Sequence, residues 1–274
     1  MAKLGKLYVI ATPLGNRSDI TLRALEVLQK ISILFAEDTR ECHKLLSLYE
    51  IPAQSKKIHS YATHNLDSAT ELAMEYLRAG EDLGLVVDRG TPGISDPGSF
   101  VVSRARAEAI QVLPVPGCSA VITALSVSGF PSNRFVFLGF LPERAKDREK
   151  LLDQASSLRV PIAVYEAPHR IRQTLETLSE RFRGADVFVA REMTKVFESY
   201  AILRLGELPL EEVEERGEYT ILLNPLPTPE KSDWTAELKL RQLSDREWSK
   251  EIAKRHGISS KTAYNELQKI KKRP

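Results

Sequence analysis

The chain has 274 residues, of which 42% are hydrophobic and 28% are charged, and its formal net charge is +2 at neutral pH. This composition is typical of a globular protein with a sizeable core, and no run of about 20 consecutive apolar residues predicts a membrane-spanning helix. The N-terminus does not resemble a signal peptide and Cys42 and Cys118 are the only cysteines, so we expect a cytoplasmic protein without a disulfide framework or a metal centre.

The first 128 residues alternate between β-rich segments and amphipathic helical segments. This alternation is typical of a mostly parallel sheet with helices packed on it. Strands are predicted at residues 6–11, 31–36, 83–87 and 111–115, and helices at residues 21–30, 41–49, 66–79, 99–109 and 119–128. Gly129 and Pro131 end the last helix. We therefore predict an N-terminal α/β domain over residues 1–128.

The alternation restarts after this break and predicts a second α/β domain over residues 129–226. Its strands are expected at residues 135–140, 160–165, 187–191, 200–205 and 219–223. The segment NPLPTPEKSD, residues 224–233, then contains three prolines, which disfavour both helix and sheet. We interpret it as a linker.

Residues 227–274 are predicted to form this basic linker and a separate helical unit. A capping box at residues 244–247 begins one helix, Gly257 allows a turn, and Ser259 begins a second helix. The spacing is typical of a helix-turn-helix. A small helical cap that packs on the rest of the protein would have the same pattern.

The C-terminal segment carries most of the positive charge. Residues 231–274 contain 12 lysines and arginines against 6 aspartates and glutamates, whereas the other 230 residues contain 27 against 31. Such a basic appendage favours binding to nucleic acid, with the exposed face of the last helix lined by Lys261, Asn265, Lys269 and Lys272. A solvated lysine-rich terminus would give the same charge count.

Three loops that suit a ligand follow predicted strands of the first domain. They are TPLGN at residues 12–16, DRGTPGISDPG at residues 88–98 and PVPGCSA at residues 114–120. Open α/β sheets bind ligands at the carboxyl ends of their strands, and glycines let the main chain approach an adenine edge or an amino-acid carboxylate and ammonium. No GxGxxG or GxxxxGK[ST] pattern occurs, which disfavours dinucleotide and ATP sites.

Each loop also has a purely structural interpretation. The first would be a tight turn between a strand and a helix. The glycine-rich run would be the entry to a helix capped by Ser95 or Asp96, and Ser119 would cap the helix that follows the third loop. Three such loops at neighbouring strand ends favour a ligand cleft.

Six segments of the chain closely resemble one known family. They read ATPLGNRSDITLRALEVL, AEDTRECHKLL, DRGTPGISDPG, VPGCSAVITALSVSGFPSNRFVFLGFLP, YEAPHRI and REMTKVFE, and they occur in order between residues 7 and 223. The family is that of the bacterial ribosomal RNA small subunit methyltransferase I, within the tetrapyrrole-methylase-like fold.

The resemblance implies a fold, a cofactor and a substrate. We expect two α/β domains with S-adenosylmethionine in the cleft between them, in a chain that forms a homodimer. The implied reaction is 2'-O-methylation of a cytidine ribose in the decoding region of small-subunit ribosomal RNA, so the implied partner is that RNA or the ribosomal subunit. No membrane or metal is implied.

The same resemblance assigns cofactor-binding residues to the three loops and to a loop of the second domain. They are Pro13, Leu14, Asp88, Arg89, Gly90, Thr91, Ile94, Ser119, Ala120, Tyr165, Glu166 and Ala167. Arg89 departs from the pattern, because relatives commonly read DAGTPG where this chain reads DRGTPG. Either its guanidinium points towards substrate phosphate, or the cofactor pocket is altered here.

The implied reaction needs alignment of a weakly nucleophilic hydroxyl and removal of its proton. Glu37, Asp38, His169, Lys195 and Glu198 are candidates near the cleft, and we hypothesise that Asp38 or Lys195 lies closest to the hydroxyl. Substrate contacts are predicted for Arg40, His169, Arg170, Glu198, Lys261 and Lys269, since guanidinium groups match phosphate oxygens.

These candidates also have structural interpretations. Asp38 would be a helix cap with Glu41 as its partner, Glu198 would pair with Lys195 or Arg191, and His169 would open a helix after Pro168. Two other functions compete with RNA methylation: a methyltransferase acting on a tetrapyrrole or another small molecule, and a ligand-sensing regulator whose C-terminal unit binds DNA.

Overall fold

The computed structural model describes residues 3–207, 210–225 and 245–271, without the side chains of residues 255, 256, 270 and 271. The chain divides into two compact units, Met1–Pro225 and Leu226–Pro274. Most of the predicted linker at residues 224–233 lies outside the described residues, as do Ser244 and Lys272. No helix within the described residues has the length and apolar character to cross a membrane.

The first sheet of the larger unit has five parallel strands in the order β3-β2-β4-β1-β5. The strands are β1 (Lys6–Ile10), β2 (Ile33–Ala36), β3 (Lys57–Ser60), β4 (Leu83–Val86) and β5 (Gln111–Val115). The four predicted strands and the parallel arrangement are confirmed. The additional strand β3 escaped prediction because its sequence, KIHS, contains one aliphatic side chain and no clear alternation.

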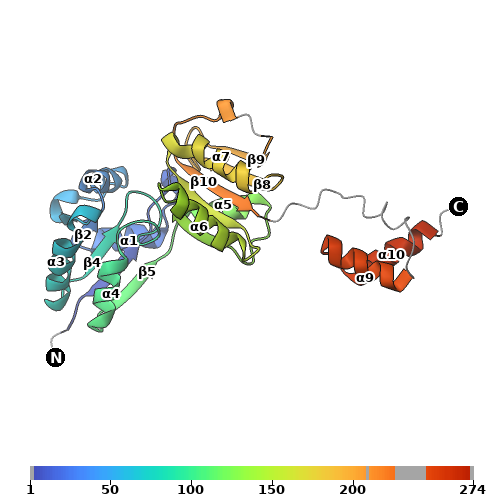
Figure 1. Ribbon diagram of the computed structural model, residues 1–274. Helices are drawn as coiled ribbons and strands as arrows, with labels where there is room; N and C mark the ends of the chain where they lie inside the picture. The colour runs from blue at the N-terminus through green and yellow to red at the C-terminus, as the bar shows by residue number, and fades with distance from the viewer. Residues whose placement is uncertain (1–2, 208–209, 226–244, 272–274) are drawn as a thin grey trace. The chain divides into compact units, whose positions relative to one another are not determined.

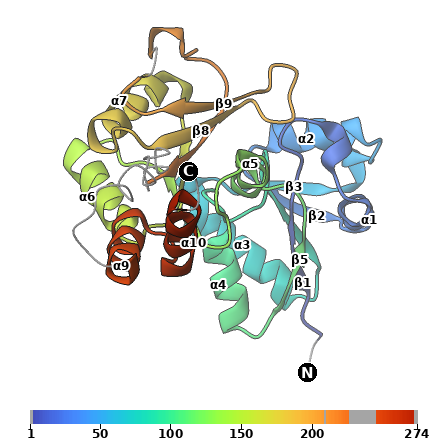
Figure 2. The same cartoon turned by 90° about the vertical axis from the view of Figure 1, so that its right-hand side faces the viewer.

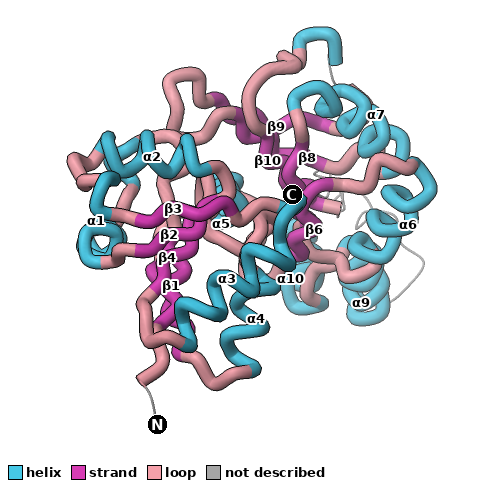
Figure 3. The backbone as a smooth tube through the Cα atoms, turned by 90° about the vertical axis from the view of Figure 1, so that its left-hand side faces the viewer, coloured by secondary structure: helices cyan, strands magenta, loops and turns pink. Residues whose placement is uncertain are grey.

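Helices cover both faces of this sheet, as Figure 3 shows. On one face, α1 (Leu22–Lys30) and α2 (Thr39–Leu48) pack with Ile10, Leu34 and Val86. On the other face, α3 (Leu66–Arg78) and α4 (Ser99–Ala107) pack with Leu7, Phe35 and Leu85. Side chains alternate between the two faces along a strand, so every residue of β2 and β4, which lie inside the sheet, is buried.

The second sheet contains the five strands that were predicted after residue 128, and it is mixed. They are β6 (Val136–Phe140), β7 (Ile162–Glu166), β8 (Asp186–Arg191), β9 (Ser199–Arg204) and β10 (Tyr219–Asn224), in the order β6-β7-β10-β8-β9. Strand β10 runs antiparallel to both of its neighbours. The first residues of β10 therefore lie beside the last residues of β7.

The second sheet also has helices on both faces (Figure 1). Helices α6 (Ala145–Ser156) and α7 (Ile171–Arg181) cover one face, where their leucines pack with Val187 and Ile221. The opposite face is covered by α5 (Ala120–Ser128), whose Val121 and Ala124 pack with Phe188 and Leu222. Helix α5 therefore follows the last strand of the first sheet in sequence but contributes to the core of the second.

The smaller unit consists, in its described part, of α9 (Asp245–His256) and α10 (Ser260–Lys271). Ile252, Ala263 and Leu267 form its core, and Gly257 adopts φ +65° between the helices. The backbone N–H of Thr262 donates to Ser259 Oγ at 3.0 Å, so Ser259 caps α10 as predicted. The two predicted helices are confirmed.

Candidate active site

The three predicted ligand loops are joined directly by hydrogen bonds. Thr12 N–H donates to the Gly90 carbonyl at 2.8 Å, Gly90 N–H donates to the Thr12 carbonyl at 3.1 Å, and Thr91 Oγ1 donates to the Cys118 carbonyl at 2.8 Å. Gly90 has φ +83°, a conformation that L side chains rarely adopt, and a Cβ there would lie 3.4 Å from Leu14 Cδ2. The loops form one continuous wall.

This wall faces the second sheet across a cavity of about 580 Å³, which is within the range of small-molecule sites. The first half of the unit contributes Leu14, Glu37, Asp38, Glu41, Asp88, Arg89, Gly90, Thr91, Ile94, Asp96, Ser119 and Ala120. The second half contributes Phe140, Tyr165, Glu166, Ala167, Pro168, Glu218, Tyr219 and Thr220. Residues from both halves of the unit are therefore required to form the cavity.

Strand direction explains the residues that sequence reasoning missed. Because β10 is antiparallel to β7, its first residues lie beside the last residues of β7, with Tyr219 opposite Glu166 and Thr220 opposite Tyr165. Glu218, Tyr219 and Thr220, which this direction brings to the cavity, were not predicted as site residues, and neither was Phe140 at the end of β6. Sequence alone does not reveal that a strand starts, rather than ends, at the edge of the sheet where the ligand loops gather.

Arg89 spans the cavity and pairs with the carboxylate of Glu218. Glu218 also accepts a hydrogen bond from Lys195 Nζ at 2.9 Å, and the same ammonium contacts Glu192 Oε1 at 2.7 Å. The guanidinium that departs from the family pattern is therefore neutralised by an acidic residue that directly precedes β10. The ion pair links the glycine-rich loop to the start of β10.

Among the acidic residues that line the cavity, Glu37, Asp88 and Asp96 lie close enough for their charges to repel one another. Loss of hydration, with the negative charges of Glu37 and Asp88, raises the pKa of Asp96 to about 7. Loss of hydration also raises the pKa values of Glu37, Asp88 and Tyr165. A cationic ligand would offset this repulsion. No group of three or more His, Cys, Asp or Glu side chains that could hold a metal ion occurs in the described part of the chain.

Asp38 both lines the cavity and caps α2. Its Oδ1 accepts the backbone N–H of Arg40 at 2.8 Å, and its Oδ2 accepts Arg40 Nη2 at 2.6 Å. These hydrogen bonds from Arg40 hold the pKa of Asp38 at about 2. The predicted cap is confirmed, but the proposed partner Glu41 pairs with Lys44 instead. The helix starts two residues earlier than predicted because Asp38 caps it.

Glu166 and Arg170 form a brace inside the second half. Glu166 is buried, its Oε2 accepts Thr174 Oγ1 at 2.6 Å, and its Oε1 lies 3.2 Å from Arg170 Nε. Arg170 also donates from Nη2 to the Leu141 carbonyl at 2.7 Å. His169 is exposed and lies in a one-turn 3-10 helix, Pro168–Arg170, directly before α7. This agrees with the interpretation that His169 opens a helix after Pro168.

Two other structural interpretations are wrong. Glu198 pairs with neither Lys195 nor Arg191, because its Oε2 accepts the Thr194 backbone N–H at 2.6 Å and Tyr200 Oη at 3.1 Å. These contacts close the loop at residues 192–198, which projects beyond β8 and β9 in Figure 2. Neither Ser95 nor Asp96 caps α4, since Gly98 takes the N-cap position without a side-chain hydrogen bond.

Comparison with known proteins places the chain in a family. Residues 6–209 match the family model of the tetrapyrrole (corrin/porphyrin) methylases. Ribosomal RNA small subunit methyltransferase I of Halalkalibacterium halodurans is 33% identical, over 95% of this chain and 94% of that protein. The chain belongs to this methyltransferase family. The same-named protein of Neisseria meningitidis serogroup A is 41% identical, over 81% of this chain and 76% of its own.

Solved structures share the fold of the larger unit. Diphthine synthase superposes with a TM-score of 0.65 at 12% identity, covering 80% of this chain and 90% of its own. A uroporphyrin-III C-methyltransferase from Thermus thermophilus, complexed with S-adenosylhomocysteine, superposes with a TM-score of 0.58 at 19% identity, covering 80% and 97%. At these identities the likeness shows the tetrapyrrole-methylase fold.

The cavity collects most of the residues that the family resemblance assigned to the cofactor. Those that line it are Leu14, Asp88, Arg89, Gly90, Thr91, Ile94, Ser119, Ala120, Tyr165, Glu166 and Ala167. Pro13 is buried and does not line the cavity, and Lys195 reaches the cavity through its contact with Glu218. Arg40, His169, Arg170 and Glu198 lie outside the lining.

Proposed function

We propose that this chain transfers a methyl group from S-adenosylmethionine to small-subunit ribosomal RNA. In its finer form, the proposal names the ribose 2'-hydroxyl of a cytidine in the decoding region. The observation that carries it is the cavity closed by both sheets, in a chain whose relatives are named as methyltransferases of that RNA. A substrate in the ribosomal subunit agrees with the expected cytoplasmic location.

The residues of the cavity fit the cofactor. When bound, S-adenosylmethionine supplies an electrophilic methyl group on a positively charged sulfur. Asp88 and Asp96 offer negative charge to its cationic groups, and Leu14 and Ile94 offer apolar surface. Gly90 has a left-handed backbone conformation, which a residue with a Cβ rarely adopts. This conformation allows the main chain of the loop to line the cavity.

The chain's own part in the reaction is alignment and charge stabilisation. We propose that Lys195, held between Glu192 and Glu218, stabilises the negative charge that develops on the hydroxyl oxygen. Asp38 is ionised at neutral pH and a weak base, so we propose that it orients Arg40. The side chain of Arg40 is 84% exposed beside the cavity and suits an RNA phosphate.

The remaining predicted substrate residues take two different roles in this proposal. Exposed His169 contacts RNA. Arg170 and Glu198 act indirectly, because their charged groups already hold the loops at either side of the cavity. Lys261 contacts RNA from the C-terminal unit, whereas Lys269 pairs with Glu266 and takes no RNA contact in this proposal.

We propose in addition that the chain is a homodimer, as the family resemblance implies. Exposed apolar side chains occur on α5, on β9 and in the loop before β9. We call this set the α5–β9 surface: Ile122, Val127, Val196, Phe197 and Ile202. Tyr200 on β9 stacks on Phe188, which packs against α5, so β9 and α5 present the same face. Apolar patches of this kind mark protein interfaces.

The decisive test is incubation of the purified chain with methyl-labelled S-adenosylmethionine and small ribosomal subunits that lack the modification. We expect label in RNA and, after digestion to nucleosides, on the ribose of cytidine. Label on a base or on another nucleoside would contradict the finer proposal. Absence of label in RNA, with transfer to a tetrapyrrole or with tight duplex DNA binding, would support one of the competing functions.

A further inference from the structure

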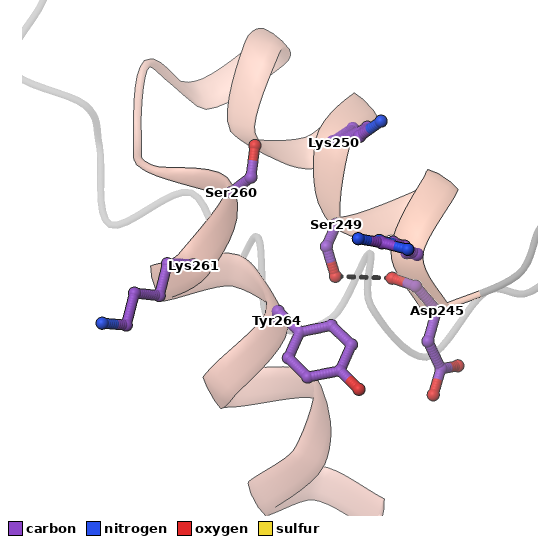
Figure 4. A pocket seen from close by; sticks show the side chains of 7 residues that line it. Asp245, Ser249, Lys250, Ser260, Lys261 and Tyr264 are labelled. Carbon is purple, nitrogen blue, oxygen red and sulfur yellow. Dashed lines mark hydrogen bonds between the residues drawn. The ribbon is translucent and has the colours of Figure 1, made fainter.

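A groove of about 650 Å³ lies between the two helices of the C-terminal unit. Figure 4 shows side chains of α9 and α10 around it. Its lining is formed by Asp245, Arg246, Ser249, Lys250, Ser260, Lys261 and Tyr264. The apolar core of the unit, Ile252, Ala263 and Leu267, is separate from this lining, so the groove is not a packing defect of the core.

The groove is positively charged. Arg246, Lys250 and Lys261 line it, and within the described side chains of residues 245–271 none of the three takes an acidic partner. Asp245 is the acidic residue of the lining, and its Oδ2 already accepts Gln268 Nε2 at 3.2 Å. The lining therefore has three cationic side chains and one carboxylate that is already hydrogen-bonded, and this net positive charge favours binding of a polyanion.

Tyr264 adds an aromatic surface to these cations. Its side chain is 42% exposed, and Figure 4 shows the ring projecting from α10 towards the α9 side of the groove. A tyrosine left half in solvent beside a packed core is available to a ligand. Aromatic side chains next to cations are the usual means of holding unpaired bases, which stack on the ring while their phosphates contact the charges.

We propose that this groove binds a single-stranded segment of the substrate RNA, with phosphates at Lys250 and Lys261 and a base stacked on Tyr264. The inference rests on the proposed function for the identity of the RNA. It replaces the earlier expectation of a lysine-lined face of α10, because Lys269 does not line the groove and pairs with Glu266 at 2.5 Å.

Two matched pairs of substitutions in the full chain test the proposal. Lys250→Glu with Lys261→Glu reverses two groove charges, and Lys254→Glu with Lys269→Glu reverses one exposed charge on each of the same helices outside the lining. We expect the groove pair to lower the affinity for a single-stranded ribosomal RNA fragment at least tenfold, and the control pair to change it less than twofold. The measurement is filter binding over a series of salt concentrations.

The salt series counts the phosphate contacts. Each contact with single-stranded nucleic acid contributes about 0.7 to the slope of log affinity against log salt, so loss of two contacts lowers the slope by about 1.4. Tyr264→Ala is expected to weaken binding about tenfold through loss of stacking, with no change in slope, whereas Tyr264→Phe retains affinity. Circular dichroism checks that the helices persist in every variant.

The outcomes separate this inference from the proposed function. Equal RNA affinity of the groove pair and the control pair, or an unchanged affinity of Tyr264→Ala, overturns the groove, whether or not the wild-type chain methylates RNA. If the groove variants lose RNA binding as expected but the wild-type chain transfers no methyl group to ribosomal RNA, the proposed function fails and the RNA-binding groove stands.

Discussion

Asp96 is a carboxylic acid of the cavity that titrates near neutral pH. Its pKa is about 7, and the groups that face it are Glu37, Asp88 and Tyr165. Below that pH the side chain is protonated and neutral, and above it the side chain adds a negative charge. The charge of the proposed cofactor site therefore changes across the physiological range.

We predict that affinity for S-adenosylmethionine rises between pH 6 and pH 8, by at most about tenfold per pH unit, because ionised Asp96 attracts the cationic ligand. Isothermal titration calorimetry across this range measures the effect. The affinity of Asp96→Asn should depend less on pH. Because protonation of the ligand affects both proteins equally, the difference between their pH profiles reports the titration of Asp96 alone. Parallel pH profiles for the two proteins would contradict the prediction.

Asp38 has two roles that substitutions can separate. Asp38→Ala removes the cap of α2 and should lower the thermal unfolding temperature, whereas Asp38→Asn keeps a capping oxygen and should change it little. Both variants release the Arg40 guanidinium from its ion pair. If Asp38 acts by orienting Arg40, both should lose methyl transfer at least tenfold with unchanged cofactor affinity. Full activity of Asp38→Asn would restrict Asp38 to the cap.

Among the elements, the loops after β1, β4 and β5 were predictable because glycine and proline punctuate them at strand ends. Their mutual contacts were not predictable in detail. The Thr12–Gly90 pairing and the Thr91–Cys118 hydrogen bond join residues more than 25 positions apart, and they depend on the strand order β4-β1-β5. Strand β3 escaped prediction for a local reason, since four residues with one aliphatic side chain carry too weak a pattern.

The C-terminal helices form an element that we predict to be dispensable for the cavity. The two units have separate apolar cores, so removal of residues 226–274 should leave the thermal unfolding of the larger unit and its cofactor affinity nearly unchanged. RNA affinity and its salt dependence should both fall. Differential scanning fluorimetry, calorimetry and filter binding measure the three quantities, and an RNA affinity equal to that of the full chain would disprove the role of the helices.

For the whole molecule, we predict dissociation of the homodimer when the α5–β9 surface is made polar. Phe197 is 72% and Ile202 62% exposed, so Phe197→Ser with Ile202→Ser should leave the fold intact while removing apolar area from the interface. Light scattering after gel filtration should show a dimer for the wild type and a monomer for this variant. Leu158→Ser, at an equally exposed apolar position outside this surface, should remain dimeric.

The amino-acid pattern alone was sufficient for the two α/β regions, the helical C-terminal pair and the wall of ligand loops. Strand and helix periodicity, caps, glycines and prolines are local signals, and the family motifs are contiguous strings. Three features required the folded chain: the packing of α5 on the second sheet, the pairing of Arg89 with Glu218, and the entry of Tyr219 and Thr220 into the cavity. Each depends on the direction of β10 or on contact between the halves, and such contacts leave no periodic trace in sequence.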